Sequence, residues 1–220
     1  MERFRNLIAN MPVNEQAFTS KRETWGKYTS DFPDLVDLIN KVFGQNTTVE
    51  ISRYDLFHLA ENKKIREFIF STILWGYPAG MRGLHFQSIL RRLNDIEKKI
   101  TSCLEEDNIH NWKEHYKTVA SIEGLGLSTY TKLLYFLKTR IESLPALILD
   151  RRLIDVFRKG IFREFTELKN IRYDNAPDRY PQYLKAMNTV AINYGLNHEN
   201  IEMFLFEFGA NLKIRSSQRN

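Results

Sequence analysis

Hydrophobic residues recur at helical spacing along almost the whole chain, so most segments have one apolar face and one polar face. Helices are expected over residues 33–43, 53–61, 63–75, 83–105, 109–122, 127–140, 151–159, 180–193 and 198–208. Ser52 and Asn197 are expected to cap two of them, and residues 48–51 to be extended. The pattern predicts an all-α protein that forms a single unit over residues 1–220.

Three segments lack the helical pattern. Residues 171–183 contain two prolines and three tyrosines, and we expect them to form an ordered loop before the last helices. The first roughly 25 residues and the tail 213–220 carry few apolar anchors, so we expect both to be loosely held.

The composition excludes several classes of site. The one cysteine, Cys103, excludes an internal disulfide framework and any cysteine-ligated zinc or iron–sulfur centre. The histidines lack metal-site spacing, so we expect neither a metal nor a cofactor. No apolar run reaches about 18 residues and no signal peptide is visible, so a cytoplasmic protein without a membrane span is expected. The net charge of +5 favours a polyanionic partner.

The stretch "SIEGLGLSTYTKLLYF" (residues 121–136) places two glycines, Gly124 and Gly126, between two helical segments. Glycine lets the backbone turn sharply and approach a partner closely. The first N–H groups of the following helix have no partner within that helix, and they form a ready phosphate site. The alternative is an ordinary turn, in which Ser128 and Thr129 cap their own helix.

A second stretch, "ALILDRRLIDVFRKG" (residues 146–160), delivers Asp150 to the start of a helix. Its apolar face is formed by Leu153, Ile154, Val156 and Phe157. Asp is also a favoured N-cap, so a purely structural role for Asp150 is the alternative.

The two stretches together resemble the helix-hairpin-helix DNA glycosylases, with the hairpin at residues 109–140 and the essential aspartate at Asp150. "GLST" and "LILD" are closest to the adenine-mismatch members. "STILWGYPAGMRG" (residues 71–83) is similar to bacterial proteins with the 8-oxoguanine glycosylase fold. The resemblance covers about residues 60–160. It implies a two-lobed helical fold and an enzyme that excises 8-oxoguanine or another damaged or modified base from DNA.

The resemblance also implies roles for three residues in base-excision repair. Asp150 would stabilise the positive charge on the sugar. Bifunctional members carry a nucleophilic lysine where this chain has Ser128, so a monofunctional enzyme that uses water is expected. Lys132 lies one helical turn further along the same face, and it is either a displaced nucleophile or a solvated lysine beside Lys138 and Arg140.

The same resemblance predicts contacts with double-stranded DNA and with the extruded base. The expected DNA-binding residues are Gly124, Gly126, Leu127, Ser128, Thr129, Arg82, Arg151 and Arg152. In "WGYP", Trp75 and Tyr77 are expected to form a wedge or a wall of the base pocket, with a place in the apolar core as the alternative. The adenine-specific members have a catalytic glutamate on the helix matching residues 63–75, but Glu67 comes one turn too early for that role.

Three functional hypotheses follow. The first is a monomeric, nucleoid-associated DNA glycosylase, and the second is a helix-hairpin-helix DNA-binding protein without catalysis. The third is a helical interaction protein whose basic charge is incidental. The sequence leaves open which base is removed and whether the target is the cell's own genome or foreign DNA.

Overall fold

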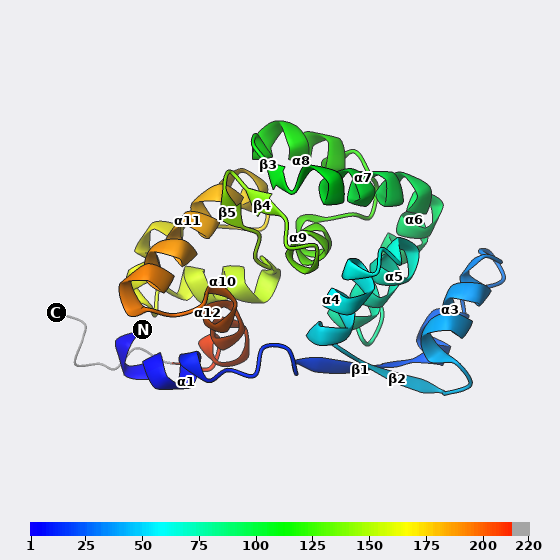
Figure 1. The fold of residues 1–220 in the computed structure, drawn as a ribbon, viewed down its shortest axis with the longest axis horizontal. Coiled ribbons are helices and arrows are strands. Elements are labelled where there is room, and N and C mark those ends of the chain that lie inside the picture. Colours follow the sequence, from blue (N-terminus) through cyan, green and yellow to red (C-terminus); the bar gives the residue numbers. More distant parts are fainter. Residues whose placement is uncertain (213–220) are drawn as a thin grey trace.

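The computed structural model describes residues 1–212 and is mainly helical, with two small sheets (Figure 1). The α-helices are α1 (Arg5–Ala9), α2 (Arg22–Gly26), α3 (Leu35–Phe43), α4 (Arg53–Glu61), α5 (Ile65–Gly76), α6 (His85–Arg91), α7 (Leu93–Glu106), α8 (Trp112–Ala120), α9 (Leu127–Phe136), α10 (Arg151–Lys159), α11 (Ala176–Tyr194) and α12 (His198–Phe204). Short helical turns are η1 (Glu2–Phe4), η2 (Arg163–Leu168) and η3 (Leu205–Gly209). The predicted all-α fold class is confirmed.

The strands form two separate small sheets. They are β1 (Ala17–Lys21), β2 (Thr48–Ser52), β3 (Asn108–Ile109), β4 (Arg140–Ile141) and β5 (Leu144–Pro145). β1 and β2 pair antiparallel, while β4 lies between a parallel β3 and an antiparallel β5. The extended segment predicted at residues 48–51 is confirmed as part of β2.

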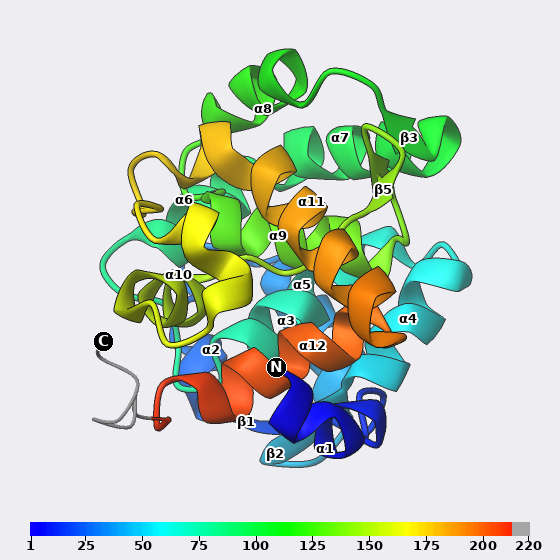
Figure 2. The ribbon, with the colours of Figure 1, turned by 90° about the vertical axis from the view of Figure 1, so that its left-hand side faces the viewer.

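Helix α9 forms the centre of the molecule, and all ten of its residues are buried. Figure 1 shows α9 almost end-on, with α3–α5 on one side and α10–α12 on the other. A ten-residue helix is about 15 Å long. The two ends of α9 therefore open toward opposite faces, with α6 and α10 near one face and α4 and β5 near the other (Figure 2).

Several of the expected helices have different boundaries. The helix expected at residues 127–140 ends at Phe136, and Arg140 belongs to β4 instead. Residues 83–105 form α6 and α7, because the chain leaves the helical conformation at Arg92 (φ −109°, ψ 14°). Helix α8 starts at Trp112 instead of residue 109, because Ile109 pairs with Ile141 in the second sheet.

The expected loop at residues 171–183 is wrong from Ala176 onward, where α11 begins. Pro177 lies in the first turn, where a missing N–H costs nothing. Pro181 cannot donate to the carbonyl of Pro177, four residues earlier. The Trp112 indole N–H donates to that carbonyl at 2.7 Å instead, so the tertiary structure satisfies the group that the proline leaves free.

The expectation of a loose N-terminus is also wrong. Strand β1 is paired along its length, and Trp25 is fully buried with its indole N–H donating to Ser20 Oγ at 2.7 Å. The tail 213–220 lies outside the described residues. Ser52 caps α4 through a reciprocal capping box with Asp55, as predicted. Asn197 precedes α12 but forms no side-chain cap. No helix in the described part of the chain is long and apolar enough to cross a bilayer.

The two hairpin glycines differ in whether the structure can accommodate a side chain at their position, and a pair of substitutions tests this difference. Gly124 has φ +86°, and a Cβ there would lie 2.7 Å from the carbonyl oxygen of His85. Gly126 has φ −75°, and a Cβ there would meet its nearest neighbour at 3.4 Å. Gly124→Ala should therefore lower the free energy of unfolding by about 1–3 kcal/mol. Gly126→Ala should stay within about 0.5 kcal/mol. Urea denaturation measures both, and equal losses would contradict this assignment.

Candidate functional site

The hairpin places the start of α9 at an exposed turn. Gly124 packs against the backbone of α6, while Gly126 is exposed and directly precedes the helix. No side chain of the described residues caps α9, so its first amides remain available to an anion. Ser128 and Thr129 do not cap their own helix, so the ordinary-turn alternative is wrong in this respect.

The side chains of the first turn of α9 are instead buried and used in packing. Leu127, Ser128 and Thr129 are each less than a tenth exposed. Thr129 Oγ1 lies 2.9 Å from the hydroxyl of Tyr77, which ties the loop after α5 to the hairpin. Only the backbone of these three residues can therefore face an external partner.

An extended segment, residues 146–149, carries the chain to Asp150, and three buried side chains hold it. Thr131 of α9 accepts from the Leu149 amide at 3.1 Å. From α11, the hydroxyls of Tyr180 and Tyr183 donate to the carbonyls of Leu147 and Ile148 at 2.7 and 2.8 Å. Because these bonds replace sheet pairing, the position of the segment is fixed without a neighbouring strand.

Asp150 ends this segment as the N-cap of α10. Its Oδ1 accepts from the Leu153 amide at 3.0 Å, and the side chain is half-buried. Asp150 also lines a cavity of about 150 Å³. It therefore caps α10 and at the same time forms part of the cavity wall.

Lys132 lines the same cavity as Asp150. Its side chain is only 4% exposed, and Nζ donates to Ser128 Oγ at 2.8 Å. A Cβ on Gly76 would lie 3.0 Å from Lys132 Cε. The absence of a side chain at position 76 therefore leaves room for the lysine side chain. The expectation of a solvated lysine beside Lys138 and Arg140 is wrong.

The two aromatic residues of the predicted base pocket have different places. Trp75 is buried in the core against Phe18 and Phe136, and it also lines the cavity. Tyr77 is half-buried at the hairpin, with Lys132 Nζ 5.6 Å from the centre of its ring. Trp75 therefore lies in the core and also lines the cavity, whereas Tyr77 lies at the hairpin and is not part of the cavity lining.

Sequence reasoning missed a buried ion pair in the lining of the cavity. Arg53 of α4 and Glu202 of α12 are each about 1% exposed or less, and Arg53 Nη2 lies 2.9 Å from Glu202 Oε2. Arg53 also donates to Gln16 Oε1 at 2.7 Å and to the Tyr135 hydroxyl at 3.0 Å. Burial raises the pKa of the Glu202 carboxyl, and the Arg53 charge partly offsets that rise. The sequence did contain one signal for this pair, because Arg53 lies on the same face of its helix as the apolar residues Leu56 and Ala60.

The predicted arginines are exposed. Arg151 and Arg152 begin α10 directly after Asp150, and the Arg152 guanidinium lies 4.5 Å from the centre of the Phe206 ring. Arg82 is exposed in the turn before α6, and no described residue forms a hydrogen bond or ion pair with it. The structure thus brings two of the three arginines to Asp150.

Tyr173 connects the hairpin and Asp150 on one face, which sequence reasoning also missed. Its hydroxyl lies 3.4 Å from the position that a Cβ on Gly126 would take. Partial burial raises the pKa of Tyr173, and the charge of Asp150 adds to that rise while Arg151 opposes it. The hydroxyl of this exposed tyrosine therefore lies beside the glycine that precedes the free amides of α9.

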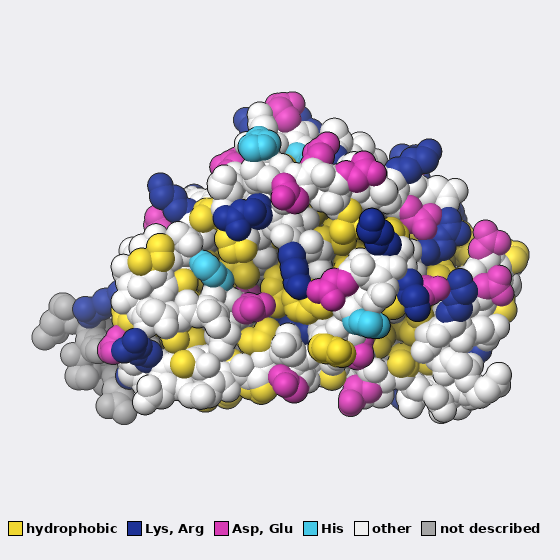
Figure 3. Space-filling model, viewed as in Figure 1, with side chains coloured by type: hydrophobic (Ala, Val, Ile, Leu, Met, Phe, Trp, Pro, Cys, Tyr) yellow, Lys and Arg dark blue, Asp and Glu magenta, His cyan; other side chains and the backbone are white. Residues whose placement is uncertain are grey.

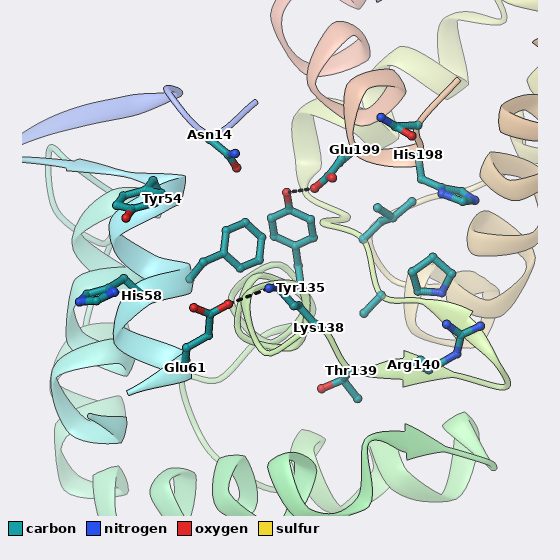
Figure 4. Close-up of a pocket in the computed structure, with 15 residues that line it drawn as sticks. Asn14, Tyr54, His58, Glu61, Tyr135, Lys138, Thr139, Arg140, His198 and Glu199 are labelled. Atoms are coloured by element: carbon teal, nitrogen blue, oxygen red, sulfur yellow. Dashed lines mark hydrogen bonds and ion pairs between the residues drawn. The ribbon is translucent and has the colours of Figure 1, made fainter. Parts of the chain in front are cut away.

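A larger groove, of about 620 Å³, opens on the opposite face (Figure 4). The Glu61–Lys138 ion pair and the hydrogen bond from Tyr135 to Glu199 cross it. Figure 3 shows basic and acidic side chains interspersed on this face around a hollow with hydrophobic side chains. None of the predicted site residues lines this groove.

The bond between Thr131 and the Leu149 amide should be essential for placing Asp150. Thr131→Val leaves a buried amide without an acceptor, which costs about 1–3 kcal/mol. Thr118→Val is the control, because its hydroxyl bonds a carbonyl at an exposed site and should change stability by less than about 0.5 kcal/mol. Thermal unfolding of both variants checks the difference, and equal stabilities would contradict it.

Comparison with known proteins identifies the family. The family model described as "Putative 8-oxoguanine DNA glycosylase OGG-like protein" matches residues 11–206, which include the hairpin, Asp150 and the cavity. No curated protein and no solved structure matches the chain significantly. The match covers most of the sequence and agrees with the predicted resemblance. The chain therefore belongs to this OGG-like family of DNA glycosylases.

Proposed function

We propose that the protein removes a damaged base from double-stranded DNA by cleaving the N-glycosidic bond, with 8-oxoguanine as the first candidate substrate. One observation carries the proposal: Asp150 and Lys132 line a cavity beside the uncapped start of α9. The family match supports glycosylase activity in general. The substrate and the roles of individual residues are the proposal.

The extruded base would enter the cavity, where aromatic side chains from three elements offer surfaces for stacking. These are Phe18 of β1, Trp75 of α5 and Phe206 of η3. The sugar would then lie at the mouth of the cavity, next to Asp150. As the bond to the base breaks, the sugar acquires oxocarbenium character, and the carboxylate stabilises that positive charge.

The backbone on either side of the extruded nucleotide would be held by phosphate contacts without base recognition. The free amides at residues 127–129 would bind one phosphate at the start of α9. Arg151 and Arg152 would neutralise phosphates next to Asp150, and Arg82 would contact the duplex further along. Binding should weaken as salt concentration rises, because each neutralised phosphate releases counterions.

Water is the nucleophile that the sequence predicts, because Ser128 stands where bifunctional members carry lysine. The burial of Lys132 in the cavity supports a second candidate. In that case the amine would attack C1′ of the sugar and the base would leave as the N-glycosidic bond breaks. Opening of the C1′–O4′ bond would give a Schiff base, and elimination of the 3′-phosphate would then cleave the strand. Hydrogen bonds to Ser128 orient Lys132, so both residues would act from one helical turn.

Asp150→Asn tests the role of the carboxylate. Asn is also a good N-cap, so the fold should persist while excision falls by about 10²–10³-fold. Asp155→Asn, on the same helix at an exposed position, is the matched control. Duplexes with 8-oxoguanine, uracil, an A·8-oxoguanine mismatch or alkylated bases are incubated and then treated with hot alkali. Salt-sensitive binding without scission by the unaltered protein would favour a non-catalytic DNA-binding protein.

Borohydride trapping distinguishes the two nucleophiles. If water attacks, no covalent adduct with DNA forms and strands break only after alkali. If Lys132 attacks, an adduct forms and is lost in Lys132→Gln. Lys138→Gln is the control, because this exposed lysine pairs with Glu61 on the opposite face and should leave trapping unchanged.

A further inference from the structure

Glu202 presents two unused hydrogen-bond acceptors inside the cavity. The side chain is fully buried and belongs to the cavity lining. Arg53 Nη2 forms an ion pair with Oε2 at 2.9 Å, but neither carboxylate oxygen has a well-aligned hydrogen bond from the described residues. Buried carboxylate oxygens without donors are costly, so such a group requires an explanation.

The other polar groups of the cavity already have partners. Gln16 accepts from Arg53 through Oε1 and donates through Nε2 to Glu207 at 2.6 Å. Lys132 donates to Ser128, and Asp150 accepts from the amide of α10. Glu202 is thus the buried side chain of this cavity whose acceptors remain free for a bound molecule.

The chemistry of the cavity limits what that molecule can be. Arg53 and Lys132 balance the charges of Asp150 and Glu202, so the cavity suits a neutral guest. Its aromatic walls suit a flat ring, and its volume of about 150 Å³ is on the scale of one base. A carboxylate with two free oxygens matches an edge with two adjacent N–H donors. Guanine-type bases have such an edge, formed by N1–H and the exocyclic amino group.

We propose that Glu202 is the specificity-determining residue of the site, and that it accepts two hydrogen bonds from the N1–H and the exocyclic amino group of a guanine-type base. This inference rests on the proposed function, because it assumes that an extruded base occupies the cavity. Adenine-type bases have a ring nitrogen acceptor at that edge, which would face the carboxylate unfavourably. The site would therefore reject them even when they carry the same oxidation at C8.

Single-turnover excision by the unaltered protein provides the first test. The probes are duplexes with 8-oxoguanine, 8-oxohypoxanthine (which lacks the exocyclic amino group) and 8-oxoadenine. Loss of a donor that a buried group requires should slow excision by at least about tenfold. Equal rates on all three would overturn the role of Glu202 and leave the proposed function intact. No excision of any damaged base would overturn both.

Glu202→Gln provides the second test. The amide has one acceptor in place of two, so excision of 8-oxoguanine should fall and the preference over 8-oxohypoxanthine should shrink toward one. Glu199→Gln is the matched control, because this carboxylate lies on the same helix but faces the groove on the opposite face. It should keep the full preference.

Folding of the Glu202 variants is checked by thermal unfolding, because Glu202→Gln leaves Arg53 without its charged partner. Glu202→Asp retains that charge and withdraws the oxygens by one methylene group, so it replaces Glu202→Gln if the latter unfolds. A folded variant that keeps the unaltered preference among the three probes would overturn the proposal.

Discussion

The complete burial of α9 is the constraint on which the site depends. A helix enclosed on all sides must satisfy its polar side chains within the protein, and several polar residues of α9 do so by holding parts of the site. Thr129 contacts the loop after α5, and Thr131 binds the segment that leads to Asp150. Lys132 is directed back along the helix to Ser128. The helix therefore positions the cavity walls, the carboxylate and the amine relative to one another.

The polar interior of the cavity follows from the same enclosure. Two cations, Arg53 and Lys132, and two carboxylates, Asp150 and Glu202, come from four different helix regions and meet around one small space. Removing one partner of the buried Arg53–Glu202 pair is far more costly than replacing both, so each of these two residues constrains the other. Asp150 has a structural partner and Glu202 has none beyond Arg53, which is why we propose different roles for the two carboxylates.

The sequence predicted the caps and apolar faces of helices correctly where residues close together in the chain specify them. The N-cap at Ser52 and the N-cap and apolar face of α10 depend on neighbouring residues, and all of them formed as expected. The predictions were wrong where contacts with residues far away in the sequence determine the local structure. Ile109 left its expected helix to pair with Ile141, and β4–β5 occupies residues 140–145 of the interval between Gly126 and Asp150.

The sequence by itself determined the helical fold class, the hairpin and the position of Asp150 at a helix start, because periodicity, glycine and capping act over a few residues. The resemblance that these motifs carry agrees with the family match. Only the tertiary structure decided that Lys132 is buried beside Asp150 and that Arg53 and Glu202 meet across the core. Arg53 and Glu202 are 149 positions apart, and no local pattern specifies which charged residue a folded core will enclose.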